Sequence, residues 1–186
     1  NATVLGVGPM SKNCVDATID LANTLKIPML LIASRRQIEC KALGKGYVNN
    51  WTTEEFAKYV KEQDKGNYIV LARDHGGPWQ GQDEQDLPYP EAMERAIVSY
   101  AADIASGFDM IHIDPSLKDR SLQEIKDDID HLFHVCESLA RGREIVYEAG
   151  TEEHNGRIST LEDFEEFICF CKGIADTKIR FVVGLT

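Results

Sequence analysis

Short apolar runs alternate with longer amphipathic stretches along the whole chain, and this alternation limits the possible folds more than any other feature. The apolar runs have the length of β-strands and number six; they cover residues 3–8, 27–33, 68–72, 110–113, 144–147 and 179–183. The stretches between them place apolar residues at helical spacing, as Val15, Ile19 and Ala22 do. Strands that are almost entirely apolar and separated by helices are typical of a parallel sheet whose outer face is covered.

Several of the intervening stretches also carry the signals of a helix start. Thr52-Thr53-Glu54-Glu55 has the composition of a helix N-terminus, Tyr89-Pro90-Glu91 opens another helix, and Thr160 is placed to cap a third. We therefore predict helices over residues 14–25, from 52 onward, from 89 onward, over about 121–139 and over 160–168.

Two α/β architectures share this pattern, an open doubly wound sheet and a closed barrel. The first apolar run ends in Gly6-Val7-Gly8-Pro9 rather than in a dinucleotide-binding glycine loop, and the repeat is regular. Polar residues recur where the runs end, which is the face on which barrels keep their active sites. We predict a TIM (β/α)8 barrel that forms a single domain over residues 1–186. Because six βα units are present where a closed barrel has eight, we expect it to lack its C-terminal strands.

The overall charge and the cysteines bear on the partners and the compartment. The net charge is −11, with 31 acidic and 20 basic residues, which argues against binding to nucleic acid or to an anionic membrane surface. No apolar run is long enough to span a membrane. The five cysteines are odd in number and show no CxxC spacing, so we expect a cytoplasmic protein with reduced thiols. Cys169 and Cys171 fall in a predicted helix that points their sulfurs apart, which favours buried structural thiols over a metal or redox pair.

The strongest candidate for chemistry is Asp74-His75-Gly76-Gly77-Pro78, at the end of the third run. An adjacent Asp and His can divide one task, since one side chain ligates a metal while the other handles a proton. The two glycines allow the backbone to approach a ligand closely. The alternative is an ordinary turn in which Asp74 caps the next helix and His75 lies on the surface.

Two further groups of polar residues lie at the ends of the fourth and fifth runs. His112 and Asp114 alternate along a strand and therefore point the same way, toward the lumen if the sheet is a barrel. Alternatively His112 is a core residue and Asp114 enters a helix. Glu148 and Glu152 are carboxylates that suit a cation or acid–base chemistry, although acidic residues are common in solvated loops.

Paired arginines follow the second run, in Ser34-Arg35-Arg36-Gln37. Guanidinium groups at an active face suit a substrate phosphate or carboxylate. A surface salt-bridge pair is the equally open alternative.

With these motifs in their order along the chain, the sequence resembles the class II tagatose-bisphosphate aldolase family, specifically its so-called non-catalytic subunit. The resemblance covers nearly the whole chain and rests on several short motifs: residues 32–38, Gly46-Tyr47, residues 52–56, Asp74-His75-Gly76-Gly77-Pro78 with Trp79-Gln80, residues 111–116 and Gly150-Thr151-Glu152. The chain departs from the family in having Arg35-Arg36 in place of a less charged segment and Gly76 in place of a bulkier residue. The sixth run ends in Gly184-Leu185-Thr186, without the histidine that typical class II aldolases have there.

The resemblance implies roles for particular residues, because the wider class II aldolases are zinc-dependent barrels. By resemblance, Asp74 is the acid/base and His75 a zinc ligand, while the fifth-strand glutamate of that family falls at Glu148 or Glu152. We assign Glu148 to the metal and Glu152 to catalysis with Asp74. The expected substrate-binding residues are Ser34, Arg35, Arg36, Gln37, Asp114 and Ser116.

These observations favour a metal-dependent enzyme, a lyase of the aldolase type or an epimerase, that acts on a sugar phosphate or sugar acid with zinc as the expected ion. The first alternative is a barrel subunit that binds and stabilises a catalytic aldolase partner, or assembles as a homo-oligomer. The second is a small-molecule-binding barrel that uses no metal. The Asp74-His75 pair favours the enzyme, because a purely structural subunit need not keep it.

Overall fold

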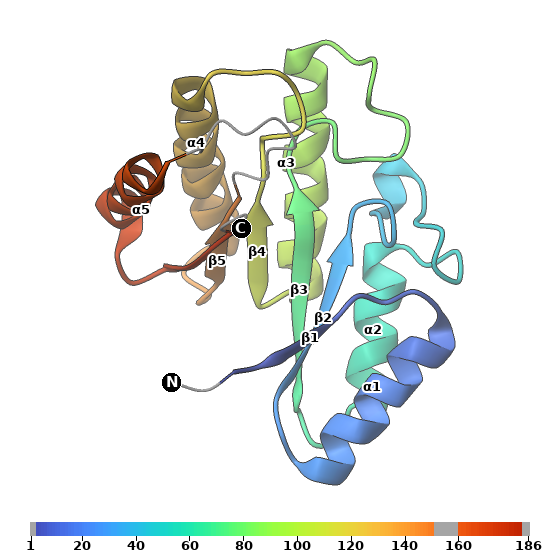
Figure 1. Ribbon diagram of the computed structural model, residues 1–186. Coiled ribbons are helices and arrows are strands. Elements are labelled where there is room, and N and C mark those ends of the chain that lie inside the picture. The colour runs from blue at the N-terminus through green and yellow to red at the C-terminus, as the bar shows by residue number, and fades with distance from the viewer. Residues whose placement is uncertain (1–2, 151–159, 184–186) are drawn as a thin grey trace.

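A parallel β-sheet with helices packed along it makes up the fold (Figure 1). The computed structural model describes residues 3–150 and 160–183. Over these residues the strands are β1 (Leu5–Val7), β2 (Met29–Ser34), β3 (Ile69–Gly76), β4 (Met110–Ile113), β5 (Val146–Ala149) and β6 (Ile179–Val182). The helices are α1 (Lys12–Leu25), α2 (Thr53–Gln63), α3 (Tyr89–Ser106), α4 (Leu122–Ala140) and α5 (Leu161–Ala175), with a 3-10 turn η1 (Lys41–Leu43).

The strands are paired in their order along the chain, β1-β2-β3-β4-β5-β6, and each pair is parallel. A doubly wound sheet reverses its strand order at a switch point, and no such reversal occurs within the described residues. Helices α1 to α4 each pack against the next, which places them on the same face of a sheet that curls as strands are added (Figure 1). The structure therefore shows an α/β fold with six parallel strands in a partial barrel.

The hydrophobic core lies between the sheet and the helices. In β2 the buried residues Met29, Leu31 and Ala33 alternate with half-buried ones, so one face of the strand packs on helices and the other faces the concave side of the sheet. Helices α2 and α4 begin with capping boxes, in which Thr52 and Ser121 accept from backbone N–H groups three residues on. No helix within residues 3–150 or 160–183 is long and apolar enough to cross a membrane.

The strand bounds differ from the sequence prediction at the two places that matter for chemistry. The predicted third strand ended at residue 72, whereas β3 continues to Gly76, because Asp74 pairs with Ser34 of β2. The predicted fifth strand covered 144–147, whereas β5 covers Val146–Ala149. Asp74, His75 and Glu148 therefore belong to strands rather than to loops. The fourth predicted strand, 110–113, was confirmed.

Candidate active site

Polar side chains form a layer on the concave face of the sheet, at the C-terminal ends of four neighbouring strands. Ser34 of β2 is paired with Asp74 of β3, and His112 of β4 is paired with Glu148 of β5. Two residues earlier on each strand, the same face carries the apolar residues Ile32, Ala72, Met110 and Val146. The polar layer therefore lies on an apolar base, at the end of the sheet where parallel α/β proteins bind ligands.

A bulge in β3 brings Asp74 and His75 to the same site. Adjacent residues of a regular strand point to opposite faces. Here the register with β4 shifts between Arg73 and Gly76, and His75 has a positive φ of 42°. Bulges of this kind re-aim side chains and are frequent beside active sites. This local distortion gives both side chains access to the concave face.

Asp74, His75 and His112 form a cluster whose possible metal-binding atoms all lie within 4.8 Å of one another. The Nδ1 atom of His112 lies 3.6 Å from Asp74 Oδ1 and 3.8 Å from Glu148 Oε2. The Nε2 atom of His75 lies 3.9 Å from Asp74 Oδ2. Two imidazoles and two carboxylates thus converge from three neighbouring strands.

His112 is almost completely buried, with 1% of its surface exposed. Its Nδ1 accepts a hydrogen bond from the backbone N–H of His75 at 3.2 Å, and its Nε2 has no hydrogen-bond partner among the described residues. A Cβ atom at Gly150 would lie 2.3 Å from that Nε2, so the backbone closes this side of the ring. Any ligand of His112 must therefore approach at Nδ1 and replace the bond from His75.

The carboxylates and imidazoles of the site shift one another's pKa values. Burial raises the pKa of Asp74, but the neighbouring His112 and His75 outweigh it, so the pKa lies below its ordinary value. Burial lowers the pKa of His112, and the carboxylates of Asp74, Asp114 and Glu148 reverse this to a net increase. When protonated, His112 carries a proton at Nδ1 near the carboxylates of Asp74 and Glu148, and when neutral its Nδ1 accepts a hydrogen bond from the backbone N–H of His75. Asp74 is therefore ionised at neutral pH and able to accept a proton.

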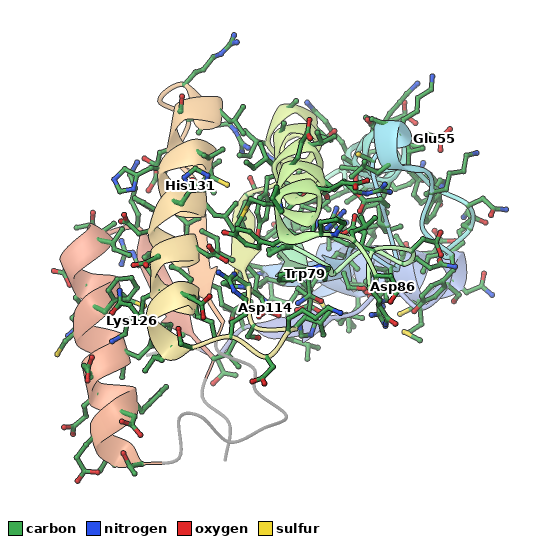
Figure 2. The ribbon with its side chains drawn as sticks, turned by 90° about the horizontal axis from the view of Figure 1, so that it is seen from above. Glu55, Trp79, Asp86, Asp114, Lys126 and His131 are labelled. Atoms are coloured by element: carbon green, nitrogen blue, oxygen red, sulfur yellow. The ribbon has the colours of Figure 1, made fainter. Side chains whose placement is uncertain are left out.

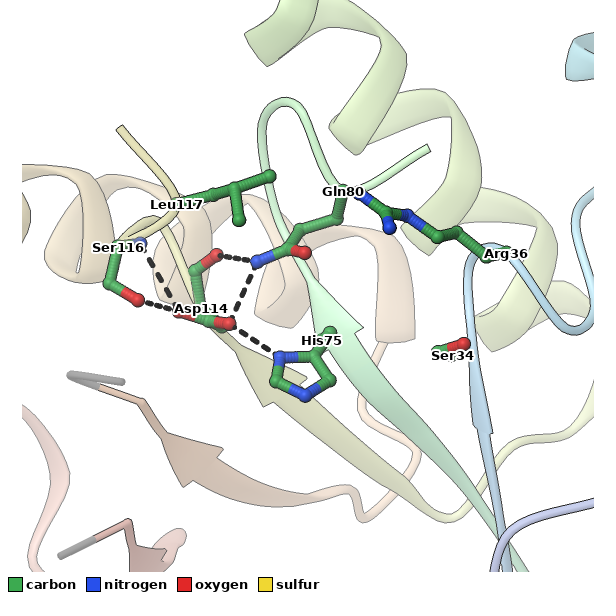
Figure 3. Close-up of a pocket in the computed structure, with 7 residues that line it drawn as sticks. All are labelled: Ser34, Arg36, His75, Gln80, Asp114, Ser116 and Leu117. Atoms are coloured by element: carbon green, nitrogen blue, oxygen red, sulfur yellow. Dashed lines mark hydrogen bonds and ion pairs between the residues drawn. The ribbon is translucent and has the colours of Figure 1, made fainter. Parts of the chain in front are cut away.

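Asp114 lies directly after β4 and is bonded on every side (Figure 3). Its Oδ2 contacts His75 Nδ1 and Gln80 Nε2, each at 2.8 Å, and its Oδ1 accepts from the backbone N–H and hydroxyl of Ser116. Burial raises the pKa of Asp114, but the hydrogen bonds from His75 and Ser116 and the charge of His112 lower it overall. Only 1% of its surface is exposed, and that small part belongs to the pocket described next.

A pocket of about 200 Å³ adjoins this network (Figure 3). Its cation is Arg36, which is exposed and has no side-chain hydrogen bond or ion pair within the part of the chain that the structure describes. The acidic surface of the protein makes such a guanidinium a distinctive anchor for an anion. The pocket is lined by Ser34, Arg36, His75, Gln80, Asp114, Ser116 and Leu117.

Arg35 has a different position from its neighbour. It is 1% exposed, and its guanidinium donates to Glu39, to Glu84 and to the carbonyl oxygen of Gly77. With its donors engaged inside the protein, Arg35 cannot bind a substrate phosphate, so this expectation is corrected. It instead joins the loops that follow β2 and β3.

The other residues that the sequence predicted for the site differ in the same respect: some lie at the site and others support the fold. Gln37 is buried, accepts from the backbone N–H of Ser34 and does not line the pocket, so it supports the turn rather than a ligand. Ser34 and Ser116 do line the pocket. Glu148 is half-buried beside His112. Glu152 lies outside the described residues.

Gln80 is the site residue that sequence reasoning missed. It follows Asp74 by a turn that includes Gly77 and the left-handed residue Trp79, with φ values of 145° and 64°. This turn brings Gln80 back onto Asp114, and the Gly-Gly-Pro sequence was its available signal. In contrast, His131 lies on the exposed side of α4, away from Asp114 (Figure 2), and takes no part in the site.

Neither a family model nor a curated protein sequence matches this chain. Solved structures do. One is described as a probable tagatose 6-phosphate kinase from Sinorhizobium meliloti 1021, with a TM-score of 0.73, 22% identity and 97% of this chain covered. Another is a fructose-bisphosphate aldolase from Campylobacter jejuni, with a TM-score of 0.60, 17% identity and 94% covered. The chain spans 48% and 50% of these proteins, about half their length, and at such identities the likeness shows the fold.

Proposed function

We propose that this chain carries the active site of a metal-dependent aldolase-type enzyme, a lyase or an epimerase, that acts on a sugar phosphate or sugar acid. The observation that supports it most is the Asp74-His75-His112 cluster at the carboxyl ends of neighbouring strands, next to a pocket with a cation. The likeness to a solved protein described as a fructose-bisphosphate aldolase supports the same reaction class. We further propose that the six strands are part of a TIM (β/α)8 barrel.

The donor set fits a divalent metal, with zinc as the proposed ion. Zinc in catalytic sites takes three protein ligands from imidazoles and carboxylates and keeps one position open. His75 and His112 offer imidazole nitrogens, and Glu148 places a carboxylate beside them. When bound, the ion would polarise the carbonyl group of a substrate.

The other residues have roles that follow from their positions. Asp74 is proposed as the acid/base, because it is an ionised carboxylate on the edge of the cluster. Arg36 is proposed to bind the phosphate or carboxylate of the substrate, with the hydroxyls of Ser34 and Ser116 nearby. Glu152 stays a proposed second acid/base on the strength of the family resemblance.

The substitution Asp74→Asn tests the proposal. A well-placed acid/base contributes about 10²–10⁴-fold to a rate, so we expect kcat on a sugar-phosphate substrate to fall by that factor. Zinc content should remain normal if Asp74 transfers protons, and should fall if Asp74 is a ligand. Asp109→Asn, at the other end of β4, is the matched control and should change neither quantity. Full activity of Asp74→Asn, or of wild-type protein freed of metal by a chelator, would overturn the proposal.

The alternative is a non-catalytic subunit that stabilises an aldolase partner. One observation favours it, since His112 Nδ1 is engaged by the His75 N–H and a metal must displace that bond. In this case the purified protein would bind no zinc and have no activity alone, and it would raise the activity or lifetime of a catalytic aldolase subunit added to it. Zinc titration of the wild-type protein separates the two functions.

A further inference from the structure

Asp114 contacts the imidazole of His75 at its Nδ1 atom. The two residues come from neighbouring strand ends, and His75 Nδ1 lies 2.8 Å from Asp114 Oδ2. Asp114 carries an ionised carboxylate, which can only accept hydrogen bonds. The proton of this bond therefore belongs to His75 Nδ1. In a neutral ring, the lone pair then lies on Nε2, which faces Asp74.

Asp114 is itself fixed by donors from two loops. Gln80 Nε2 donates to Asp114 Oδ2 and also to the backbone oxygen of Asp114, at 2.8 and 3.3 Å. Ser116 donates to Oδ1 through its backbone N–H and its hydroxyl. The carboxylate cannot turn without breaking these bonds, because donors lie on both of its oxygens.

We infer that Asp114, held by Gln80 and Ser116, is a positioning residue that keeps His75 in the Nδ1–H form and aims Nε2 at the Asp74 side of the site. The inference deepens the proposed function and rests on it for the metal that Nε2 would bind. A carboxylate behind a metal-binding histidine fixes its tautomer and orientation, and loss of such a partner typically costs about 10–100-fold in metal affinity. Gln80 influences His75 indirectly, because it hydrogen-bonds to Asp114.

The tautomer can be measured without any metal. Long-range ¹H–¹⁵N spectra of the metal-free protein near pH 8, above the ordinary histidine pKa of about 6.5, distinguish a protonated ring nitrogen from one with a lone pair. The His75 signals are assigned by their loss in His75→Gln. We expect the wild type to show the proton on Nδ1, and Asp114→Asn to shift the ring toward the Nε2–H form. A wild-type His75 with its proton on Nε2 would overturn the inference.

Zinc affinity is the second readout. Competition with a chelating dye should show affinity about 10–100-fold weaker in Asp114→Asn and weaker in the same direction in Gln80→Leu. Gln82→Leu, an exposed glutamine of the same loop, and Asp109→Asn are matched controls that should bind zinc like the wild type. Native-like Asp114→Asn and Gln80→Leu proteins with unchanged tautomer and unchanged zinc affinity would overturn it. If Asp114→Asn does not fold, Gln80→Leu carries the test alone.

The two readouts separate this inference from the proposed function. A wild-type protein that binds no zinc would remove the metal-dependent function, and the tautomer spectra would still decide whether Asp114 positions His75. A protein that binds zinc tightly while His75 holds its proton on Nε2 would keep the function and remove the positioning role.

Discussion

At the scale of single residues, the clearest result is that the neighbours Arg35 and Arg36 have different positions and different roles. The first is buried against Glu39 and Glu84, and the second is exposed at the pocket. Burying two carboxylates is tolerable only while their partner is present. One arginine therefore serves the fold, and the other is available to a substrate.

The substitutions Arg35→Met and Arg36→Met should separate these roles. Removing one partner of a buried ion pair typically costs about 3–5 kcal/mol, so Arg35→Met should lower the free energy of unfolding by an amount of that order. Arg36→Met should leave stability unchanged, because its side chain is solvated, and should raise KM for an anionic substrate if Arg36 has the role proposed for it. Urea denaturation and steady-state kinetics measure the two effects. Equal stability losses in both variants would contradict this division.

At the scale of elements, two glycines predict opposite effects of the same substitution. In α5, a Cβ atom at the exposed Gly173 would meet no other atom within 4 Å, so Gly173→Ala should stabilise the protein by about 0.5–1 kcal/mol. In β3, a Cβ atom at Gly76 would lie 2.4 Å from the Tyr100 ring and 2.6 Å from the His112 carbonyl oxygen. Gly76→Ala should therefore destabilise the protein and displace the bulge. Thermal unfolding compares the pair, and a stabilised Gly76→Ala protein would contradict this close packing around Gly76.

The contact between helices α3 and α4 should make stability depend on pH. The hydroxyl of Tyr89 in α3 donates to Asp128 in α4, and burial together with that carboxylate raises the pKa of Tyr89 to about 12, from 10.0. The folded state thus holds this proton more tightly than the unfolded state. Its contribution to stability is present below about pH 10 and is lost as the pH rises toward 12.

Tyr89→Phe removes this dependence. We expect the variant to be less stable than the wild type near neutral pH, because a hydrogen bond is lost, and to lose less stability between about pH 9 and pH 11. Urea denaturation at several pH values gives both slopes. Tyr47→Phe, at an exposed tyrosine, is the control and should keep the wild-type slope. A variant slope identical to that of the wild type would remove Tyr89 as the cause.

At the scale of the whole molecule, the burial of the five cysteines indicates which parts of the native fold exclude solvent. Cys40, Cys136 and Cys171 are buried, Cys14 is half-buried and Cys169 is exposed. Burial raises the pKa of all three buried thiols, to about 11 for Cys40 and about 12 for Cys171, so they hold their protons at neutral pH. Cys169 and then Cys14 should react with a thiol reagent in the native protein, and the other three only after unfolding. Rapid reaction of Cys136 without denaturant, followed by mass spectrometry, would show that the helical layer opens.

The sequence alone determined the order and type of the elements, because apolar spacing and helix capping depend on residues close together in the chain. The six strand positions, the helix starts at Thr52, Ser121 and Thr160, and the gathering of polar residues at the strand ends followed from such local patterns. Helical geometry also pointed the sulfurs of Cys169 and Cys171 in different directions, but the expectation that both thiols are buried was wrong for Cys169, which is exposed.

Only the tertiary structure decided which polar residues face the site. Arg35 and Arg36 are chemically identical neighbours, and their roles diverge because Glu84, 49 residues after Arg35, neutralises only one of them. The bulge at His75 and the return of Gln80 to Asp114 likewise depend on pairing between strands and on a turn. Some partners are local, such as Glu39 for Arg35 and Ser116 for Asp114, but the partners that decide these roles are Glu84 for Arg35 and His75 for Asp114. Both are distant in the chain, so no local pattern contains them.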